Sequence, residues 1–277
     1  HSVSYLPYRA FGSVNPKVWY CFVLFLFLVY PFFIAAQVNL NFDELSIDDG
    51  FSSSRANVIL QDRVGYIWVG TWNGLNRYDG YECIVYQPNI DDSLSLSNRE
   101  VTALIEDRNG FLWVGTTQGL NKYDPVLNRF KKYHFNKRIL SLAEDSDGNI
   151  WVGTMGEGLH MLDPESGKTK HFFGTDRVYS VFEDSKQNIW LATGYGIINF
   201  DRLTQSHKVY NVENRWLRSK VGTSPRSIVE SDDGCLWLGM WSGGLCKLIP
   251  NDNKDSVKIE AYVPGQQEGR ISSYPVD

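Results

Sequence analysis

One short phrase recurs five times along this chain and constrains its fold more than any other feature. This motif consists of a turn, an apolar pair that ends in Trp, one or two small residues, and a Gly-Leu or Gly-Ile pair. Spacings of 45, 38, 39 and 47 residues separate Trp68, Trp113, Trp151, Trp190 and Trp237. A period near forty with unequal loops is typical of a β-propeller. We therefore expect these Trp residues to fill the wedge between neighbouring blades.

Each repeat contains the residues for four short antiparallel strands. In the second repeat, residues 101–106 predict a strand, residues 107–110 a hairpin turn, and residues 111–116 the returning strand. A second turn leads to a third strand, and residues 129–133 have the polarity of a solvent-exposed edge strand. The sequence therefore predicts an all-β propeller of four-stranded blades at about residues 58–86, 101–133, 139–173, 178–210 and 227–262.

Glycines and partial repeats add two expectations. A glycine in mid-strand indicates close approach of another backbone or of the blade's Trp, and this applies to Gly70, Gly115, Gly153 and Gly239. Residues 271–277 predict the start of a further blade, so five blades plus partial blades make a ring that is incomplete in this span. Because apolar blade faces would be uncovered, we expect the isolated span to be marginally stable or prone to aggregate.

The first 36 residues differ in composition from the repeats. Residues 18–36 carry no charge, follow Arg9 and Lys17, and end in two alanines, which is the pattern of a secretory signal peptide. An uncleaved N-terminal anchor is the alternative, since nineteen uncharged residues are at the lower end of what spans a bilayer. With either interpretation residues 1–36 direct export, and residues 37–277 form the propeller domain.

Charge and cysteine content narrow the function classes. The formal net charge is −5 at pH 7, and it becomes −7 without residues 1–36, so nucleic acid is not an expected partner. Three of the four cysteines, Cys83, Cys235 and Cys246, lie outside residues 1–36. They lack the spacing of a zinc site, and we expect them to be small buried residues. The sequence has no Gly-x-Ser-x-Gly, phosphate-loop or H-E-x-x-H motif, so we predict no catalytic residue, metal or cofactor.

Three weaker patterns have ordinary explanations. Residues 145–149 resemble the start of a calcium loop, but the downstream Glu is absent, and Asp107 and Asp184 occupy the same hairpin, which favours a turn. Lys131 and Lys132 indicate an exposed strand edge. Solvated surface without metal pairing is expected for His134, His160, His171 and His207.

The string Asp62-x-x-Gly-x-Ile-Trp68-Val-Gly-Thr71-x-x-Gly-Leu-Asn-Arg-Tyr-Asp-Gly80, with residues 48–52 upstream, resembles the two-component regulator propeller repeat. The similarity covers about residues 39–277. Three positions depart from the pattern: Gln187 replaces the turn Gly, Ser231 replaces Asp, and Met240 replaces Thr. These departures weaken single hairpins rather than the assignment.

This resemblance implies the periplasmic sensor region of a hybrid two-component histidine kinase, as found especially in gut Bacteroidetes. In such proteins an immunoglobulin-like domain, a membrane helix, a kinase, a receiver and a DNA-binding output follow the propellers, which implies membrane tethering, a homodimer and a phosphorelay. It further implies a glycan or oligosaccharide ligand and control of polysaccharide-utilisation genes. A secreted lyase or hydrolase, or a stand-alone carbohydrate-binding propeller, is the alternative because fold alone does not decide function.

In a propeller, turns between second and third strands share one face with the connections between blades. Aromatic rings beside amides, hydroxyls and a carboxylate suit a sugar. We therefore predict ligand contacts from Trp72, Asn73, Gln118, Met155, Glu157, Tyr195, Trp216, Arg218, Trp241 and Ser242. The alternative is that each of these residues simply completes its turn, since loops are enriched in function only as a class.

Overall fold

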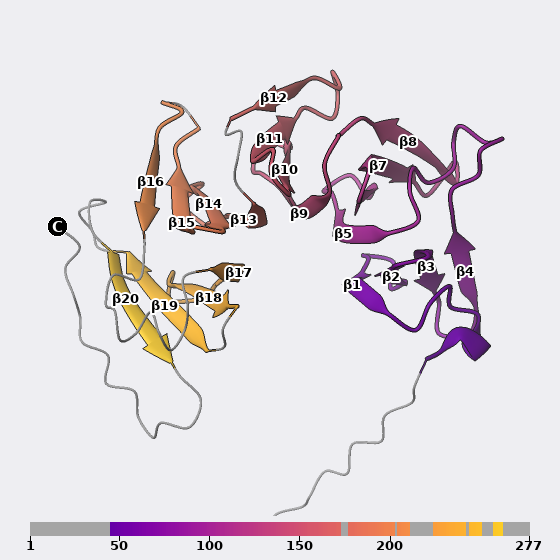
Figure 1. Cartoon of the computed structure of the whole chain (residues 1–277), viewed down its shortest axis with the longest axis horizontal. Helices are drawn as coiled ribbons and strands as arrows, with labels where there is room; N and C mark the ends of the chain where they lie inside the picture. The colour runs from indigo at the N-terminus through magenta and orange to yellow at the C-terminus, as the bar shows by residue number, and fades with distance from the viewer. Residues whose placement is uncertain are drawn as a thin grey trace, which may run out of the picture. The chain divides into compact units, whose positions relative to one another are not determined.

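The computed structural model describes residues 45–172, 177–202, 204–210, 224–241, 244–250 and 257–262. Apart from one short 3-10 helix, η2 (Ile47–Asp49), the elements within these ranges are β-strands. They form five sheets of four antiparallel strands each, paired in chain order within every sheet (Figure 1). This confirms the predicted all-β fold of four-stranded blades. The predicted leader (1–36) and the partial blade at 271–277 lie outside the described residues.

The five sheets follow one another along the chain without exchanging strands. The first sheet consists of β1 (Ala56–Gln61), β2 (Ile67–Thr71), β3 (Gly74–Tyr78) and β4 (Cys83–Tyr86). The second consists of β5 (Val101–Glu106), β6 (Leu112–Thr116), β7 (Gly119–Asp124) and β8 (Arg129–Tyr133). The third consists of β9 (Ile139–Glu144), β10 (Ile150–Thr154), β11 (Leu159–Leu162) and β12 (Thr169–His171). The fourth consists of β13 (Val178–Glu183), β14 (Ile189–Thr193), β15 (Gly196–Phe200) and β16 (His207–Tyr210), and the fifth of β17 (Pro225–Glu230), β18 (Leu236–Met240), β19 (Leu245–Pro250) and β20 (Val257–Tyr262).

An aspartate anchors the hairpin between the first and second strands in each of the first four sheets. One carboxylate oxygen of Asp107 accepts the backbone N–H groups of Asn109 at 2.9 Å and Phe111 at 3.0 Å. The other oxygen accepts the indole N–H of Trp113 at 2.8 Å. The same 2.8 Å indole bond is made by Asp62, Asp145 and Asp184. One side chain therefore both closes the turn and fixes the orientation of the ring.

The two departures in these turns change local geometry without changing the sheet. In the fifth sheet the hydroxyl of Ser231 donates to Asp233 at 2.5 Å, and Trp237 lies half-buried. In the fourth sheet Gln187 adopts a φ of +64°, the left-handed conformation that Gly110 adopts at +85° in the second. A side chain in this conformation is strained by contact between its Cβ and the backbone, so the hairpin tolerates Gln187 at a cost.

Each buried Trp packs against the sheet that follows its own. Contacts join β5 to β9 and β9 to β13, and Figure 1 shows these first strands beside one another. Trp113 is fully buried in a cluster with Ile139, Leu142 and Ile150 of the third sheet. Equivalent clusters contain Trp68, Trp151 and Trp190. Burying one such ring removes roughly 200 Å² from water, worth at most about 5 kcal/mol.

Gly70, Gly115 and Gly153 make room for the first strand of the next sheet, whereas at Gly239 an added Cβ would lie 2.5 Å from Oγ of Ser227 in its own sheet. A Cβ added to Gly115 would lie 2.6 Å from Cγ2 of Ile139, and Gly70 has the same relation to the second sheet. The expectation that a backbone or the Trp approaches is wrong at these positions, because a branched side chain of the next sheet does. At Gly153 a backbone does approach, since the added Cβ would lie 2.7 Å from the carbonyl oxygen of Val178.

Candidate functional site

The turns between second and third strands lie at the same end of the sheets as the residues that lead into each first strand. Backbone hydrogen bonds connect the two sets, from Thr117 N–H to the Glu100 carbonyl at 3.2 Å and from Trp241 N–H to the Ser224 carbonyl at 3.0 Å. We call this end the turn face. The opposite end carries the hairpins between first and second strands, and we call it the hairpin face. The predicted ligand contacts that lie within the described ranges belong to the turn face.

Four large apolar side chains of the predicted set are exposed on the turn face. The exposed fractions are 46% for Trp72, 43% for Met155, 72% for Tyr195 and 70% for Trp241. The indole N–H of Trp72 donates to Oδ1 of Asn57 at 2.7 Å, which fixes that ring. Aromatic rings held in this way offer a flat apolar surface against which a ligand can stack.

The polar members of the predicted set are used partly within the turns. The backbone carbonyl of Asn73 accepts from Nε2 of Gln87 at 2.6 Å, and that of Glu157 lies 2.8 Å from Nε2 of His171. Gln118 is exposed. Three other predicted residues lie outside the described ranges, namely Trp216, Arg218 and Ser242.

Two arginines that stack on the Trp72 and Trp241 rings were not among the residues predicted from the sequence. The guanidinium of Arg55 lies over Trp72, 4.2 Å from the ring centroid. The guanidinium of Arg226 contacts two rings, 3.5 Å from the centroid of Tyr179 and 4.2 Å from that of Trp241. Both arginines stand next to the first residue of a first strand. Aligning the repeats on their Trp residues would have placed both arginines beside the predicted turns.

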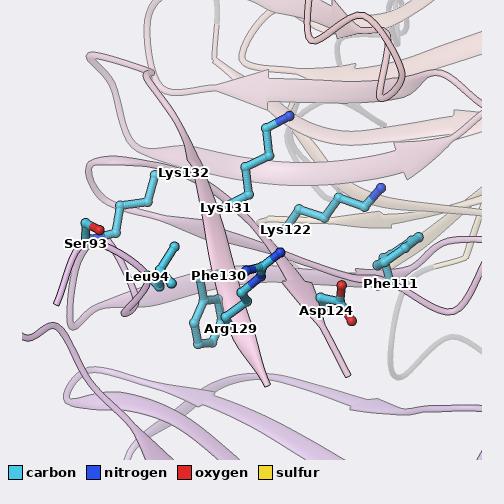
Figure 2. Close-up of a pocket in the computed structure, with 9 residues that line it drawn as sticks. All are labelled: Ser93, Leu94, Phe111, Lys122, Asp124, Arg129, Phe130, Lys131 and Lys132. Carbon is cyan, nitrogen blue, oxygen red and sulfur yellow. The ribbon is translucent and has the colours of Figure 1, made fainter. Parts of the chain in front are cut away.

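A cationic pocket of about 510 Å³ lies along the outer strands of the second sheet (Figure 2). Its lining consists of Ser93, Leu94, Phe111, Lys122, Asp124, Arg129, Phe130, Lys131 and Lys132. Nζ of Lys122 lies 3.7 Å from the centroid of the Phe111 ring, and burial lowers the pKa of Lys122. Lys131 and Lys132 are exposed, as predicted for a strand edge, and they also line this pocket.

One histidine differs from the prediction of a solvated surface. The ring of His160 lies 4.6 Å from that of His171 and 5.3 Å from that of Phe135, between centroids. His160 is half-buried, and its Nε2 has no hydrogen-bond partner within the described residues. Burial, with a smaller contribution from His171, lowers the pKa of His160. The prediction is therefore wrong for His160, because Phe135 and β12 cover it, whereas His134, His171 and His207 are exposed.

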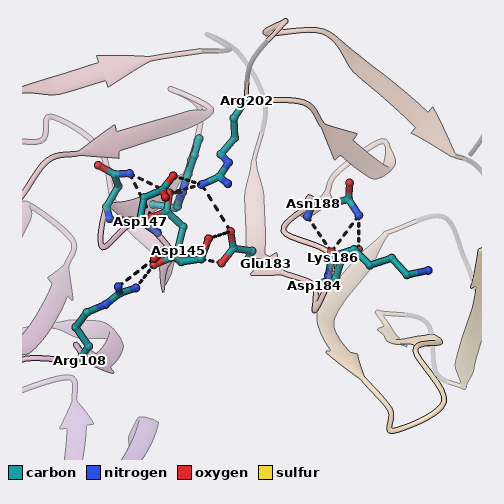
Figure 3. A network of polar contacts seen from close by, with 11 residues as sticks. Arg108, Asp145, Asp147, Glu183, Asp184, Lys186, Asn188 and Arg202 are labelled. Carbon is teal, nitrogen blue, oxygen red and sulfur yellow. Dashed lines mark hydrogen bonds and ion pairs between the residues drawn. The ribbon is translucent and has the colours of Figure 1, made fainter.

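Ion pairs and hydrogen bonds on the hairpin face connect each sheet to the next. The backbone N–H and Nε of Arg108 donate to the carboxylate of Glu144 at 2.8 and 2.6 Å. Equivalent bonds to the following sheet come from Arg63, Ser146 and Ser185. Figure 3 shows Arg202 reaching Asp145 at 3.1 Å and Asp147 at 2.9 Å. The Asp145 carboxylate accepts hydrogen bonds from the turn backbone, from the Trp151 indole and from Arg202. Residues 145–149 therefore form a turn, as predicted, rather than a calcium loop.

The described residues show neither a metal centre nor a disulfide. Among them no group of three or more His, Cys, Asp and Glu side chains could hold a metal ion. No helix in the described ranges is both long and apolar enough to cross a membrane. Cys83, Cys235 and Cys246 are free, and burial raises the pKa of Cys246 to about 12. Cys235 and Cys246 are buried as predicted, but Cys83 is only half-buried.

Consecutive four-stranded blades with a wedge Trp between them define this protein as a β-propeller. The profile of the two component regulator propeller family matches residues 50–73, 95–118, 134–156 and 173–195. Four stretches of the chain therefore carry the two-component regulator propeller repeat, which confirms the predicted resemblance.

Known structures and a curated relative support this assignment. Two solved structures of one extracellular domain from B. thetaiotaomicron, described once as part of a one component system and once as part of a hybrid two component system, match with TM-scores of 0.63 and 0.59. Both are 19% identical to this chain; the matches cover 80% and 77% of it and 35% and 34% of those chains. Virginiamycin B lyase from Staphylococcus aureus matches with a TM-score of 0.51 at 15% identity, covering 79% of this chain and 83% of the lyase. At such identities these structures establish the fold, and the fold is shared with an enzyme.

One curated relative is similar in sequence. A stretch of 75 residues is 40% identical to Histidine kinase P4 of Formosa agariphila. This stretch is 27% of the present chain and 5% of that kinase. The chain thus spans about a third of the solved extracellular domains, and the match spans a small part of the kinase.

Proposed function

We propose that this chain is the ligand-sensing region of a hybrid two-component sensor kinase and that it binds a glycan or oligosaccharide on the turn face. The repeat family and the similarity to Histidine kinase P4 support the sensor role. The exposure of Trp72, Tyr195 and Trp241 on one face carries the glycan part of the proposal. Sugars present a flat C–H face that stacks on such rings, and these rings are not needed in the core.

In this proposal ligand binding shifts the equilibrium between two arrangements of neighbouring sheets. Each sheet packs mainly against its neighbours, so a ligand that contacts two adjacent turns acts directly on the angle between two sheets. The change is transmitted through a homodimer and across the inner membrane to a kinase, and a phosphorelay then controls polysaccharide-utilisation genes. In this proposal residues 1–36 direct export, so that the sensor lies in the periplasm.

A binding experiment with matched variants tests this proposal. The intact chain is applied to an array of oligosaccharides, and the retained glycans are titrated against wild type and the double variant Trp72→Ala with Trp241→Ala. Loss of two stacking rings should weaken binding at least about tenfold, since each ring contributes roughly 0.5–1.5 kcal/mol beyond its buried area. Tyr81→Ala is the control, because Tyr81 is 94% exposed in the turn between β3 and β4, away from the turn face.

The outcomes separate the sensor from the alternatives. Equal binding by wild type and the double variant would remove the turn face as the ligand site. Shortening of a bound glycan during incubation would instead favour a propeller enzyme of lyase or hydrolase type. In cells that produce the full-length protein, the double variant should abolish the transcriptional response to the glycan, whereas Tyr81→Ala should preserve it.

A further inference from the structure

The guanidinium of Arg226 is held so that its hydrogen-bonding edge has no partner in the described residues. Its carbon Cζ lies 3.5 Å from the centroid of the Tyr179 ring and 4.2 Å from that of the Trp241 ring. The guanidinium thus contacts two aromatic rings, and its N–H donors lie in the plane of the group. Within the described residues no oxygen accepts a hydrogen bond from Arg226, and its Nε is buried. Such a donor requires an acceptor from outside these residues.

A β-bulge directs Arg226 toward the turn face. The pairing of β17 with β18 shifts register between Pro225 and Ser227, so Arg226 is the extra residue. Bulges turn a side chain out of its regular position in the ladder. The same shift occurs at Tyr179 in the fourth sheet, and Tyr179 supplies one of the two rings. Because strands rather than a flexible loop position this arginine, binding loses little conformational entropy.

Positive charge predominates where the chain enters the first strands. The charged residues on either side of the first position of each first strand are Arg55, Glu100, Arg138, Arg177 and Arg226. The single carboxylate among them, that of Glu100, is paired with Arg138 at 2.7 Å. The whole chain has a net charge of −5, so this local excess of arginine does not reflect composition. Because Glu157 also lies on the turn face and Arg177 interacts with another group, the excess concerns Arg55 and Arg226 and favours an anion beside them.

We propose that Arg226 binds the carboxylate or sulfate group of an acidic sugar. This inference rests on the proposed function and specifies the class of glycan. A carboxylate or sulfate presents two oxygens that match the guanidinium fork, whereas a hydroxyl of a neutral sugar presents one. The exposed surfaces of Trp241 and, on the adjacent sheet, Tyr195 are available to stack on the sugar ring. The anion and the ring are thus recognised by separate side chains.

The Nε–H resonance of Arg226 in the intact, isotope-labelled chain gives a direct test. Glucuronate, inorganic sulfate and glucose are added in separate titrations, and the resonance is assigned in the unaltered chain through bonds from the backbone amide of Arg226. We expect a saturable shift with glucuronate or sulfate and none with glucose. The anion that binds with the higher affinity shows whether the natural ligand carries a carboxylate or a sulfate, because a planar carboxylate and a tetrahedral sulfate form different hydrogen-bond geometries with the guanidinium. Absence of a shift with both anions would overturn the proposal.

Variants provide a second measurement. Arg226→Gln should weaken glucuronate or sulfate binding about 10- to 100-fold, since hydrogen bonds to charged groups are among the strongest in proteins. Arg226→Lys keeps the positive charge but cannot form two parallel hydrogen bonds to the anion. Its affinity for the anion should therefore lie between those of the wild type and Arg226→Gln. Lys168→Gln is the control, because it removes one positive charge from an exposed residue in the turn between β11 and β12. Equal weakening by Arg226→Gln and Lys168→Gln would assign the effect to net charge and contradict the proposal.

The same probes distinguish this inference from the function on which it rests. If neutral oligosaccharides bind the turn face and both anions leave Arg226 unaffected, the anion site is refuted and glycan sensing stands. If the anions shift the Arg226 resonance but no oligosaccharide is retained, glycan sensing is refuted and the anion site stands. If both Arg226 variants fail to fold, the titration of the unaltered chain decides alone.

Discussion

Replacing Asp107 with Ala should destabilise the second sheet strongly, because one buried carboxylate serves three donors. Asp107 is 2% exposed and accepts hydrogen bonds from two backbone N–H groups and from the Trp113 indole. Trp113 is fully buried, so in the variant its N–H has no access to water. The lost indole bond costs about 1.5–3 kcal/mol, and the two turn bonds, which water can partly replace, add about 1–2 kcal/mol. The sum is about 2.5–5 kcal/mol, a fall of roughly 5–20 °C in Tm.

Amide hydrogen exchange and urea unfolding together measure this effect. Because each sheet packs mainly against its neighbours, protection should fall most in residues 101–124 and least in residues 225–250. Ser231→Ala is the matched control: Ser231 occupies the same turn position in the fifth sheet and makes no bond to an indole, so its loss should cost under about 1 kcal/mol. If Asp107→Ala costs no more than Ser231→Ala, the Asp–Trp unit does not stabilise the blade.

Three other changes test local geometry. Gly115→Ala should lower the unfolding free energy by about 1–3 kcal/mol, measured in urea, because the new Cβ would lie 2.6 Å from Cγ2 of Ile139. Gln187→Gly should raise it by up to about 1 kcal/mol by relieving the left-handed backbone at φ +64°. Burial and His171 lower the pKa of His160 below 6.5. The unfolded chain therefore binds the proton more readily, so stability present above about pH 6.5 is lost as pH falls, and His160→Gln should flatten the pH dependence of Tm between pH 7.5 and 5.

The repeat period was sufficient to predict the blades because packing imposes it. Each blade must present a large ring to its neighbour and leave room for the neighbour's first strand, so Trp and Gly recur at fixed places. The bond between Asp107 and Trp113 could not be read from their spacing of six residues. It depends on the hairpin register, which pairs Ile105 with Trp113 and brings the turn over the indole.

The sequence predicted the aromatic residues of the candidate site but not its arginines, and the reason again lies in the strand register. Aromatic residues in turns, such as Trp72 and Trp241, could be found because a turn exposes its side chains. The arginines that stack on them lie in or beside a strand, where alternation would assign every second residue to a sheet face. The bulge at Arg226 breaks this alternation, and no local signal in the sequence marks its position.

The two faces of this propeller therefore have different constraints. On the hairpin face, Asp, the buried Trp and the carboxylates that link the sheets recur with little change, because each is needed for the angle between blades. On the turn face, the bulge position holds a different residue in each sheet: Asn57, Thr102, Leu140, Tyr179 and Arg226. Two of these residues bond to a sheet, since Nδ2 of Asn57 donates to the Val101 carbonyl at 2.9 Å and the hydroxyl of Thr102 donates to the Gly115 carbonyl at 3.1 Å. The side chain of Arg226 makes no hydrogen bond within the described residues, so its substitution should alter the proposed ligand binding while preserving stability. Substitutions in the Asp–Trp units should lower stability and affect binding only through the fold.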